Sequence, residues 1–245
     1  MSKYKATLEY FGKPFVGWQR QKNGFSVQQA LEEAIKNFCG QDVITYVAGR
    51  TDAGVHAFGQ VCHFEIEKKQ TAETIRNAIN FHLKPNPITV LNVVEVDETF
   101  HARFSAKERY YRYKIMNRAT PSAIYSDLSW WVPQPLDIDL MTAASKCLIG
   151  KHDFSTFRAA GCQAKSPIKT LNSITFWREG DEVLMETRAK SFLYHQVRNM
   201  AGTLKLVGEK KWNLQDFSSA FNARTRVRGG ITAPACGLYF MKVDY

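Results

Sequence analysis

The residues best suited to chemistry lie between Gly49 and Ala57, where an arginine, an aspartate and a histidine fall between two glycines. An aspartate in an isolated turn of this kind usually caps its own backbone. Here Arg50 and His56 flank Asp52, and basic segments follow further along the chain. Together they favour a reactive loop in which Asp52 is the catalytic carboxylate.

Strand-like patterns enclose this segment on both sides. Residues 42–48 are predicted to form one strand, and residues 61–66 alternate with the period of two that a strand produces. The segment therefore occupies a loop between two strands. A sheet holds the backbone of such a loop while a side chain reaches a ligand, and glycines allow the backbone to turn tightly.

The first hundred residues follow the order β-α-β-β-α-β. Strands are predicted at residues 4–10 and 88–96, besides the pair around Asp52. One helix begins after Ser26 and ends at Gly40, and another begins after Thr71. This order is typical of the split βαβ arrangement of ferredoxin-like folds, with an antiparallel sheet and two helices on one face.

The same order recurs in the second half without a clear sequence repeat. The expected strands are 106–116, 168–177, 182–189 and 237–243, and the expected helices are 139–149, 192–207 and 214–221. The sequence therefore predicts an α+β protein of two ferredoxin-like (RRM-like) subdomains whose antiparallel sheets meet at a central basic cleft. Residues 1–100 carry the Asp52 loop, and residues 101–245 complete the site.

The amino-acid composition indicates which class of partner the protein binds and in which cellular compartment it is found. The chain of 245 residues has 33 Lys and Arg against 23 Asp and Glu, a net charge of +10, which favours a polyanion such as nucleic acid. Five scattered cysteines without a Cys-x-x-Cys pair indicate reduced thiols. We see no signal peptide and no apolar run of about 18 residues, so we expect a soluble, cytoplasmic protein.

Sequence motifs for common cofactors are missing. The chain contains no dinucleotide-binding glycine pattern, no phosphate-binding Gly-x-x-x-x-Gly-Lys-Ser/Thr and no His-Glu-x-x-His. Its six histidines also lack the spacing of metal ligands. These observations argue against nucleotide-dependent and zinc-dependent chemistry.

Positive charge is concentrated just after the first hundred residues. Between positions 101 and 118 six cations accompany the single acid Glu108: Arg103, Lys107, Arg109, Arg112, Lys114 and Arg118. Alternation puts Tyr111 and Arg112 on opposite faces of the predicted strand. A phenol facing the cleft beside cations facing solvent suits a stacked base and a tracked RNA backbone. A half-buried strand with a solvated basic face explains the pattern equally well.

Arginines stand out in two later segments. Arg198 lies at the border of the apolar face of a predicted helix, where it either pairs with a surface carboxylate or pairs with Asp52. The second pairing would favour the ionised form of that aspartate. Arg224, Arg226 and Arg228 alternate before two glycines and suggest a mobile basic loop, although a plain solvated loop is the simpler interpretation.

An ordered series of segments resembles the tRNA pseudouridine synthase A (TruA) family nearly from end to end. The matching segments include residues 17–19 with Gln21, 49–57 with 59–61, 100–106, 111–113, 153–154, 192–193, 197–200, 233–234 and 237–239. By this resemblance Asp52 is the catalytic aspartate, Tyr111 lies against the target uracil and Arg198 pairs with the aspartate. Leu238 lines the same pocket, and Arg50 helps to displace the target base.

The resemblance also implies a reaction and its partners. It implies a homodimer of two-domain subunits that isomerises uridines 38, 39 and 40 of the tRNA anticodon arm, without cofactor or metal. The reaction breaks the N1–C1′ bond, turns the uracil and joins C5 to C1′, and it transfers neither electrons nor phosphate. Attack by Asp52 at C1′, addition at C6 and removal of the 2′ proton remain open as routes.

Two other functions fit the same basic cleft. One is a catalytically silent protein that binds or folds RNA. The other is a pseudouridine synthase acting on a different RNA. Release of the C5 hydrogen from uridine in tRNA distinguishes the tRNA enzyme from a silent binding protein. The same assay with other RNAs reveals a synthase that acts on a different substrate.

Overall fold

A computed structural model describes residues 1–67 and 69–245, and the chain divides into two compact units. The first unit contains Met1–Arg109 together with Tyr239–Tyr245, and the second contains Tyr110–Leu238. The last strand of the chain therefore belongs to the first unit, and Tyr239 and Phe240 pair there with His56 and Ala57. The division 1–100 and 101–245 that the sequence suggests has its boundary at a different place and assigns the last strand to the second half.

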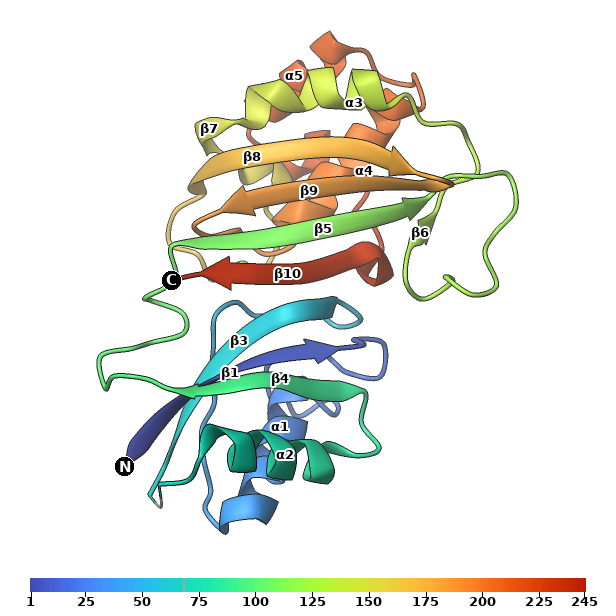
Figure 1. Cartoon of the computed structure of the whole chain (residues 1–245). Coiled ribbons are helices and arrows are strands. Elements are labelled where there is room, and N and C mark those ends of the chain that lie inside the picture. The colour runs from blue at the N-terminus through green and yellow to red at the C-terminus, as the bar shows by residue number, and fades with distance from the viewer. Residues whose placement is uncertain (68) are drawn as a thin grey trace. The chain divides into compact units, whose positions relative to one another are not determined.

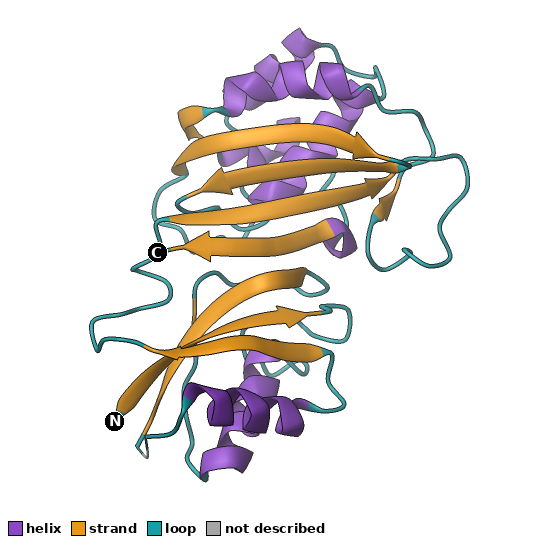
Figure 2. Ribbon diagram, in the orientation of Figure 1, coloured by secondary structure: helices purple, strands orange, loops and turns teal. Residues whose placement is uncertain are grey.

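The first unit is a sheet with helices on one side (Figures 1 and 2). Neighbouring strands pair antiparallel in the order β4 (Ile88–Glu95), β1 (Ser2–Tyr10), β3 (His56–Ile66). The short β2 (Tyr46–Val47) pairs antiparallel with β3, whereas the start of β10 (Leu238–Asp244) pairs parallel with it. The helices are α1 (Val27–Cys39) and α2 (Ala72–Leu83).

Both helices of the first unit have the caps that the sequence predicts. The Ser26 hydroxyl accepts a hydrogen bond from the Gln29 amide at 3.1 Å, and Gly40 ends α1 with a φ of 75°. The Thr71 hydroxyl likewise accepts from the Thr74 amide. Both predicted helices are thus confirmed. Each cap forms a hydrogen bond with a backbone group that the helix itself leaves unpaired.

The strand predicted at residues 42–48 is reduced to the two residues of β2. A carboxylate on α1 explains the difference. The Thr45 amide and hydroxyl both donate to Glu32 Oε1, at 2.9 and 3.1 Å, in a buried setting. This backbone amide therefore bonds to a side chain instead of a neighbouring strand, and ladder pairing starts only after it.

The second unit is also a sheet with helices on one side (Figures 1 and 2). Its strands follow the order β5 (Glu108–Met116), β9 (Glu182–Ala189), β8 (Ile168–Glu179), β7 (Gly150–Asp153), and β6 (Trp130–Trp131) pairs with β5. Its helices are α3 (Ile138–Ser145), α4 (Gln196–Gly208) and α5 (Leu214–Asn222). The strands and helices expected there are confirmed, apart from small shifts at their ends.

One of these shifts concerns α4, which was expected to begin at residue 192. It begins at Gln196 because His195, in a left-handed conformation with a φ of 59°, precedes its first turn. The Leu193 amide donates to the Gln196 side chain at 2.8 Å, which closes the turn before the helix.

The chain is a mixed α+β protein with mostly antiparallel strand pairing.

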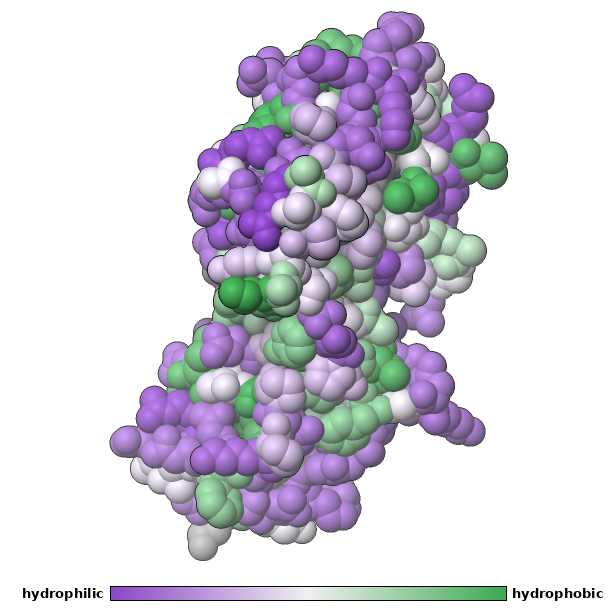
Figure 3. Space-filling model, turned by 90° about the vertical axis from the view of Figure 1, so that its right-hand side faces the viewer, coloured by the Kyte–Doolittle hydropathy of each residue, from purple (hydrophilic) through white to green (hydrophobic). Residues whose placement is uncertain are grey.

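The surface is mostly polar on the face drawn in Figure 3, where hydrophobic residues form separate patches. Within residues 1–67 and 69–245, no helix has the length and apolar character needed to span a membrane. The same residues contain no group of three or more His, Cys, Asp or Glu arranged to hold a metal ion. All five cysteines are free thiols.

Candidate active site

Asp52 lies in a tight turn between β2 and β3, as predicted. The Val55 amide donates to the Asp52 carbonyl oxygen at 3.1 Å, and Gly54 has the positive φ, 79°, that the third position of a type II turn requires. Asp52 also forms an isolated antiparallel bridge with Gly17. The side chain is half-buried and is presented on a backbone that is bonded on both sides.

Two glycines in the loop after β1 allow the chain to approach this turn closely. A Cβ on Gly17, whose φ is 105°, would lie 2.6 Å from the Thr51 carbonyl oxygen. A Cβ on Gly12 would overlap with the carbonyl oxygen of Val55. The Trp18 amide adds a hydrogen bond to the Thr51 carbonyl at 3.0 Å. The Asp52 turn is therefore enclosed by backbone at distances that leave no room for a side chain.

Buried hydroxyl and amide groups hold the start of the loop. Tyr10 Oη and Thr51 Oγ1 are 2.8 Å apart, and Gln60 Nε2 donates to both Tyr10 Oη and the Gly49 carbonyl, at 3.4 and 2.8 Å. Burial raises the pKa of Tyr10 to about 12, so its hydroxyl keeps its proton at neutral pH. Either hydroxyl of the Tyr10–Thr51 pair can donate the hydrogen, and the bond links the end of β1 to the start of the loop in both cases.

His56 and Arg50, the other polar residues of the segment, occupy different environments. His56 is buried between the rings of Phe11 and Tyr239, with ring centroids 5.0 and 4.8 Å away. Its Nδ1 accepts a hydrogen bond from the Gly12 amide at 3.0 Å. His56 thus supports the loop, whereas Arg50 is exposed at its start.

Arg109 connects the beginning of this segment to a later turn. Its Nε and Nη2 donate to the Ala48 carbonyl oxygen at 2.9 and 2.6 Å, and Nη2 also donates to the Arg103 carbonyl at 2.8 Å. The side chain is buried, and the alternation along β5 puts it on the same face as Tyr111. A guanidinium with several fixed donors is suited to joining two backbone segments.

In the second unit, Tyr111 is on the buried face of β5, as the alternation predicts. It is 8% exposed, and its ring meets Phe192 edge to face, with centroids 5.1 Å apart. On the opposite face, Arg112 lies 2.9 Å from Glu186 Oε2 and 5.2 Å from the Trp177 ring. Arg112 is thus on the face opposite Tyr111, as predicted, but its guanidinium is not free in solvent, because Glu186 on the neighbouring β9 and Trp177 on β8, one strand further, hold it.

Arg198 and Leu238 adjoin the same stretch of chain, residues 233–238. Arg198, in the first turn of α4, donates from Nε to the Ala233 carbonyl oxygen at 2.8 Å. Tyr113 Oη donates to the Pro234 carbonyl at 2.7 Å, which binds the stretch to β5. Leu238 follows at its end and is buried. Residues from α4 and β5 thus fix the segment that leads into Leu238.

The candidate residues are therefore divided between the two units. Asp52 and Arg50 belong to the first, and Tyr111, Arg198 and Leu238 belong to the second. Within each unit the structure fixes the backbone that carries them. The pairing of Arg198 with Asp52 concerns residues of different units and stays a prediction.

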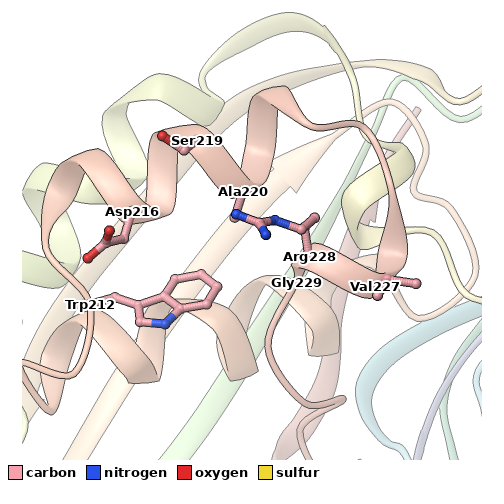
Figure 4. Close-up of a pocket in the computed structure, with 7 residues that line it drawn as sticks. All are labelled: Trp212, Asp216, Ser219, Ala220, Val227, Arg228 and Gly229. Atoms are coloured by element: carbon pink, nitrogen blue, oxygen red, sulfur yellow. The ribbon is translucent and has the colours of Figure 1, made fainter.

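The arginine-rich segment before Gly229 is partly ordered by secondary structure. Arg226–Arg228 form a 3₁₀ helix, η3, and Arg226 Nη2 donates to Thr232 Oγ1 at 3.1 Å. Arg228 borders a hollow of about 310 Å³ in the second unit (Figure 4). The hollow is lined by Trp212, Asp216, Ser219, Ala220, Val227, Arg228 and Gly229. None of the candidate catalytic residues lines this hollow.

Comparison with known proteins identifies the family. A family profile described as tRNA pseudouridine synthase matches residues 6–105 and 144–245. The tRNA pseudouridine synthase A of Rhodospirillum centenum is 54% identical over 245 residues, all of both chains. The protein of the same name from Paramagnetospirillum magneticum is 51% identical over all of this chain and 96% of its own. The chain belongs to the tRNA pseudouridine synthase family.

Proposed function

We propose that this protein isomerises uridine to pseudouridine at positions 38, 39 and 40 of the tRNA anticodon arm. Identity above 50% along the whole chain to proteins named tRNA pseudouridine synthase A supports the reaction and the substrate. The net charge of +10 suits a polyanionic RNA. The observation that carries the proposal is the Asp52 turn, which presents a carboxylate on a backbone enclosed by Gly12 and Gly17.

Asp52 is the catalytic carboxylate in this proposal. The N1–C1′ bond of uridine breaks, the uracil turns, C5 bonds to C1′, and the C5 proton leaves while N1 gains a proton. Atoms and electrons balance without another reactant. A carboxylate serves this reaction as a nucleophile at C1′ or C6, or as a base at the 2′ position. Fixing the backbone before substrate arrives keeps the carboxylate in a reactive geometry.

The remaining candidates bind the target nucleotide. Arg50, exposed before the turn, takes part in displacing the base from its stack, a step that costs a few kcal/mol. Tyr111 and Leu238 lie against the detached uracil and retain it. Arg198 pairs with the Asp52 carboxylate and keeps it ionised. The bond from Arg198 Nε to Ala233 supports this role because it fixes the orientation of the guanidinium.

The proposal also covers architecture and assembly. The element order in each unit supports two ferredoxin-like subdomains. Following the family resemblance, the protein is a homodimer that works in the cytoplasm without cofactor or metal. Free thiols at all five cysteines agree with a reducing compartment.

Tritium release tests the proposed function. Purified protein is mixed with an anticodon-arm tRNA carrying 5-tritiated uridine, and substrates with cytidine at 38, 39 or 40 map the sites. We expect release that stops when all three uridines are replaced. Salt-sensitive binding without release would indicate a silent RNA-binding protein, and release only from other RNAs would indicate a different substrate. Either result would refute the proposal.

A further inference from the structure

A turn over residues 101–105 holds a large aromatic side chain out in solvent. Phe104 is 73% exposed, and the guanidinium of Arg103, also exposed, lies 5.5 Å from its ring. Nearby, Tyr46 on β2 is 47% exposed. We call Tyr46, Arg103 and Phe104 the aromatic platform. Exposed apolar side chains that gather on one surface, unlike single scattered ones, are typical of interaction sites.

The turn that carries this platform is held by two histidines. His63 Nδ1 accepts a hydrogen bond from the Ala102 amide at 3.1 Å, and His101 Nδ1 accepts from the Arg103 amide at 3.1 Å. The Ser105 amide donates to the His101 carbonyl at 2.9 Å. Phe104 and Arg103 are thus displayed from a bonded turn, which limits the entropy that they would lose on binding.

The rings form a continuous series from the sheet to the turn. His63 stacks on Tyr46, with centroids 5.0 Å apart, and meets His101 at 4.7 Å. His101 in turn lies 4.4 Å from Phe104. Tyr46 and Phe104 therefore belong to one aromatic surface, and its buried member, His63, is only 4% exposed.

The platform is joined to the Asp52 segment by a single side chain. Arg109 Nη2 bonds both the Arg103 carbonyl within the turn and the Ala48 carbonyl, four residues before Asp52. The two segments share a buried bridge in the first unit. A ligand seated on the platform is therefore held by the same part of the molecule as the catalytic turn.

We propose that the aromatic platform is a binding subsite for the tRNA substrate, outside the target-uridine pocket. A base exposed in the loop of the RNA stacks on Phe104 and Tyr46, and Arg103 contacts an adjoining phosphate. A surface that combines aromatic rings with a cation suits single-stranded RNA. Every base has a face that can stack on a ring, and every phosphate linkage carries a negative charge that a cation can bind. This inference rests on the proposed function, since it takes tRNA as the substrate.

The charge around the aromatic platform and its small area favour RNA, and not a second copy of this chain, as the partner that binds there. From Arg103 to Arg109 the sequence holds three cations and one acid, Glu108. A stable protein dimer usually buries about 1,200 to 2,000 Å² in total. Three exposed side chains supply little of such an area, whereas one stacked base and one phosphate match them.

Binding and turnover of Phe104 variants test the inference. We expect Phe104→Ala to raise both the Kd and the KM for tRNA about tenfold, with kcat reduced less than twofold. Phe104→Tyr, which keeps the ring, should restore affinity to within about twofold. The matched control is Phe81→Ala on α2, a phenylalanine that is 71% exposed and should leave Kd and KM unchanged.

Arg103→Ala separates phosphate contact from stacking. We expect the slope of log Kd against log salt to decrease by about one for this variant and to stay unchanged for Phe104→Ala. If the wild-type enzyme is active and both variants keep its Kd and KM, the inference is overturned while the proposed function stands. A loss of dimer in sedimentation of Phe104→Ala would overturn it in favour of a subunit contact. An inactive wild type would instead refute the proposed function.

Discussion

Two loops of the first unit carry residues that we propose to meet RNA, and the chain fixes them in different ways. The Asp52 turn is enclosed mainly by backbone, because Gly12 and Gly17 approach it where a Cβ would collide. The turn at residues 101–105 is held by imidazole nitrogens of His63 and His101 that accept amide hydrogens. The first arrangement places a reacting group, and the second displays a binding surface.

The difference predicts different sensitivities. A close contact between backbones is lost when a side chain is added at the glycine. It does not depend on pH, because glycine has no side chain that titrates. An imidazole nitrogen accepts a hydrogen bond only while it is unprotonated. The Asp52 turn should therefore respond to added volume, and the platform turn should respond to acid.

The largest effect is expected from Gly12→Ala. Its Cβ would overlap with the Val55 carbonyl and displace the Asp52 turn, so kcat should fall by about 10²-fold. Gly40→Ala is the matched control. Gly40 has a positive φ of 75° but no neighbouring atom within 4 Å of the added Cβ, so it should cost about 1 kcal/mol of stability without loss of kcat. Equal activity of the two variants would contradict the account of the turn.

A smaller effect is expected from acid through His63. Burial, with His101 second, lowers the pKa of His63 to about 4. An unfolded histidine titrates near 6.5, so the unfolded chain binds a proton that the folded chain excludes between these values. Stability should therefore fall as the pH drops from about 6.5 to 4, because the unfolded chain gains a proton that the folded chain excludes.

Urea unfolding across that pH range checks the contribution of His63. In His63→Gln, the amide oxygen replaces the acceptor without titrating, so stability should depend less steeply on pH than in the wild type. Parallel curves for the two proteins would show that His63 does not carry the acid sensitivity.

The smallest effect is expected from Ser105→Ala. The Ser105 hydroxyl accepts a hydrogen bond from the His101 amide at 3.0 Å in an exposed position, where water replaces the lost partner. The free energy of unfolding should fall by less than about 1 kcal/mol, and the affinity for tRNA should change less than in Phe104→Ala. A loss of affinity as large as that of Phe104→Ala would mean that the hydroxyl, and not the ring, organises the platform.

Local patterns revealed much of the fold and of the candidate site. The caps at Ser26 and Thr71, the alternation through Tyr111 and the loop position of Asp52 all depend on neighbours within a few residues, which the sequence displays directly. The family resemblance added the candidate roles. Its assignment is confirmed, although the residue roles themselves stay predictions.

Interactions between distant residues explain what the sequence did not reveal. The bond from Thr45 to Glu32 shortens a strand across 13 positions, and the bond from Ala102 to His63 spans 39. The pairing of Arg112 with Glu186 spans 74 positions and removes the expected free cation. Each depends on which strands become neighbours, and that information lies in the tertiary fold.

The central claim is that the carboxylate of Asp52 performs the chemistry, and Asp52→Asn tests it most directly. The change keeps nearly the same shape and removes the charge. We predict that tritium release from 5-tritiated tRNA falls by at least about 10³-fold, while the Kd for tRNA stays within about threefold of wild type. Release by purified Asp52→Asn at a rate comparable to wild type would contradict the account.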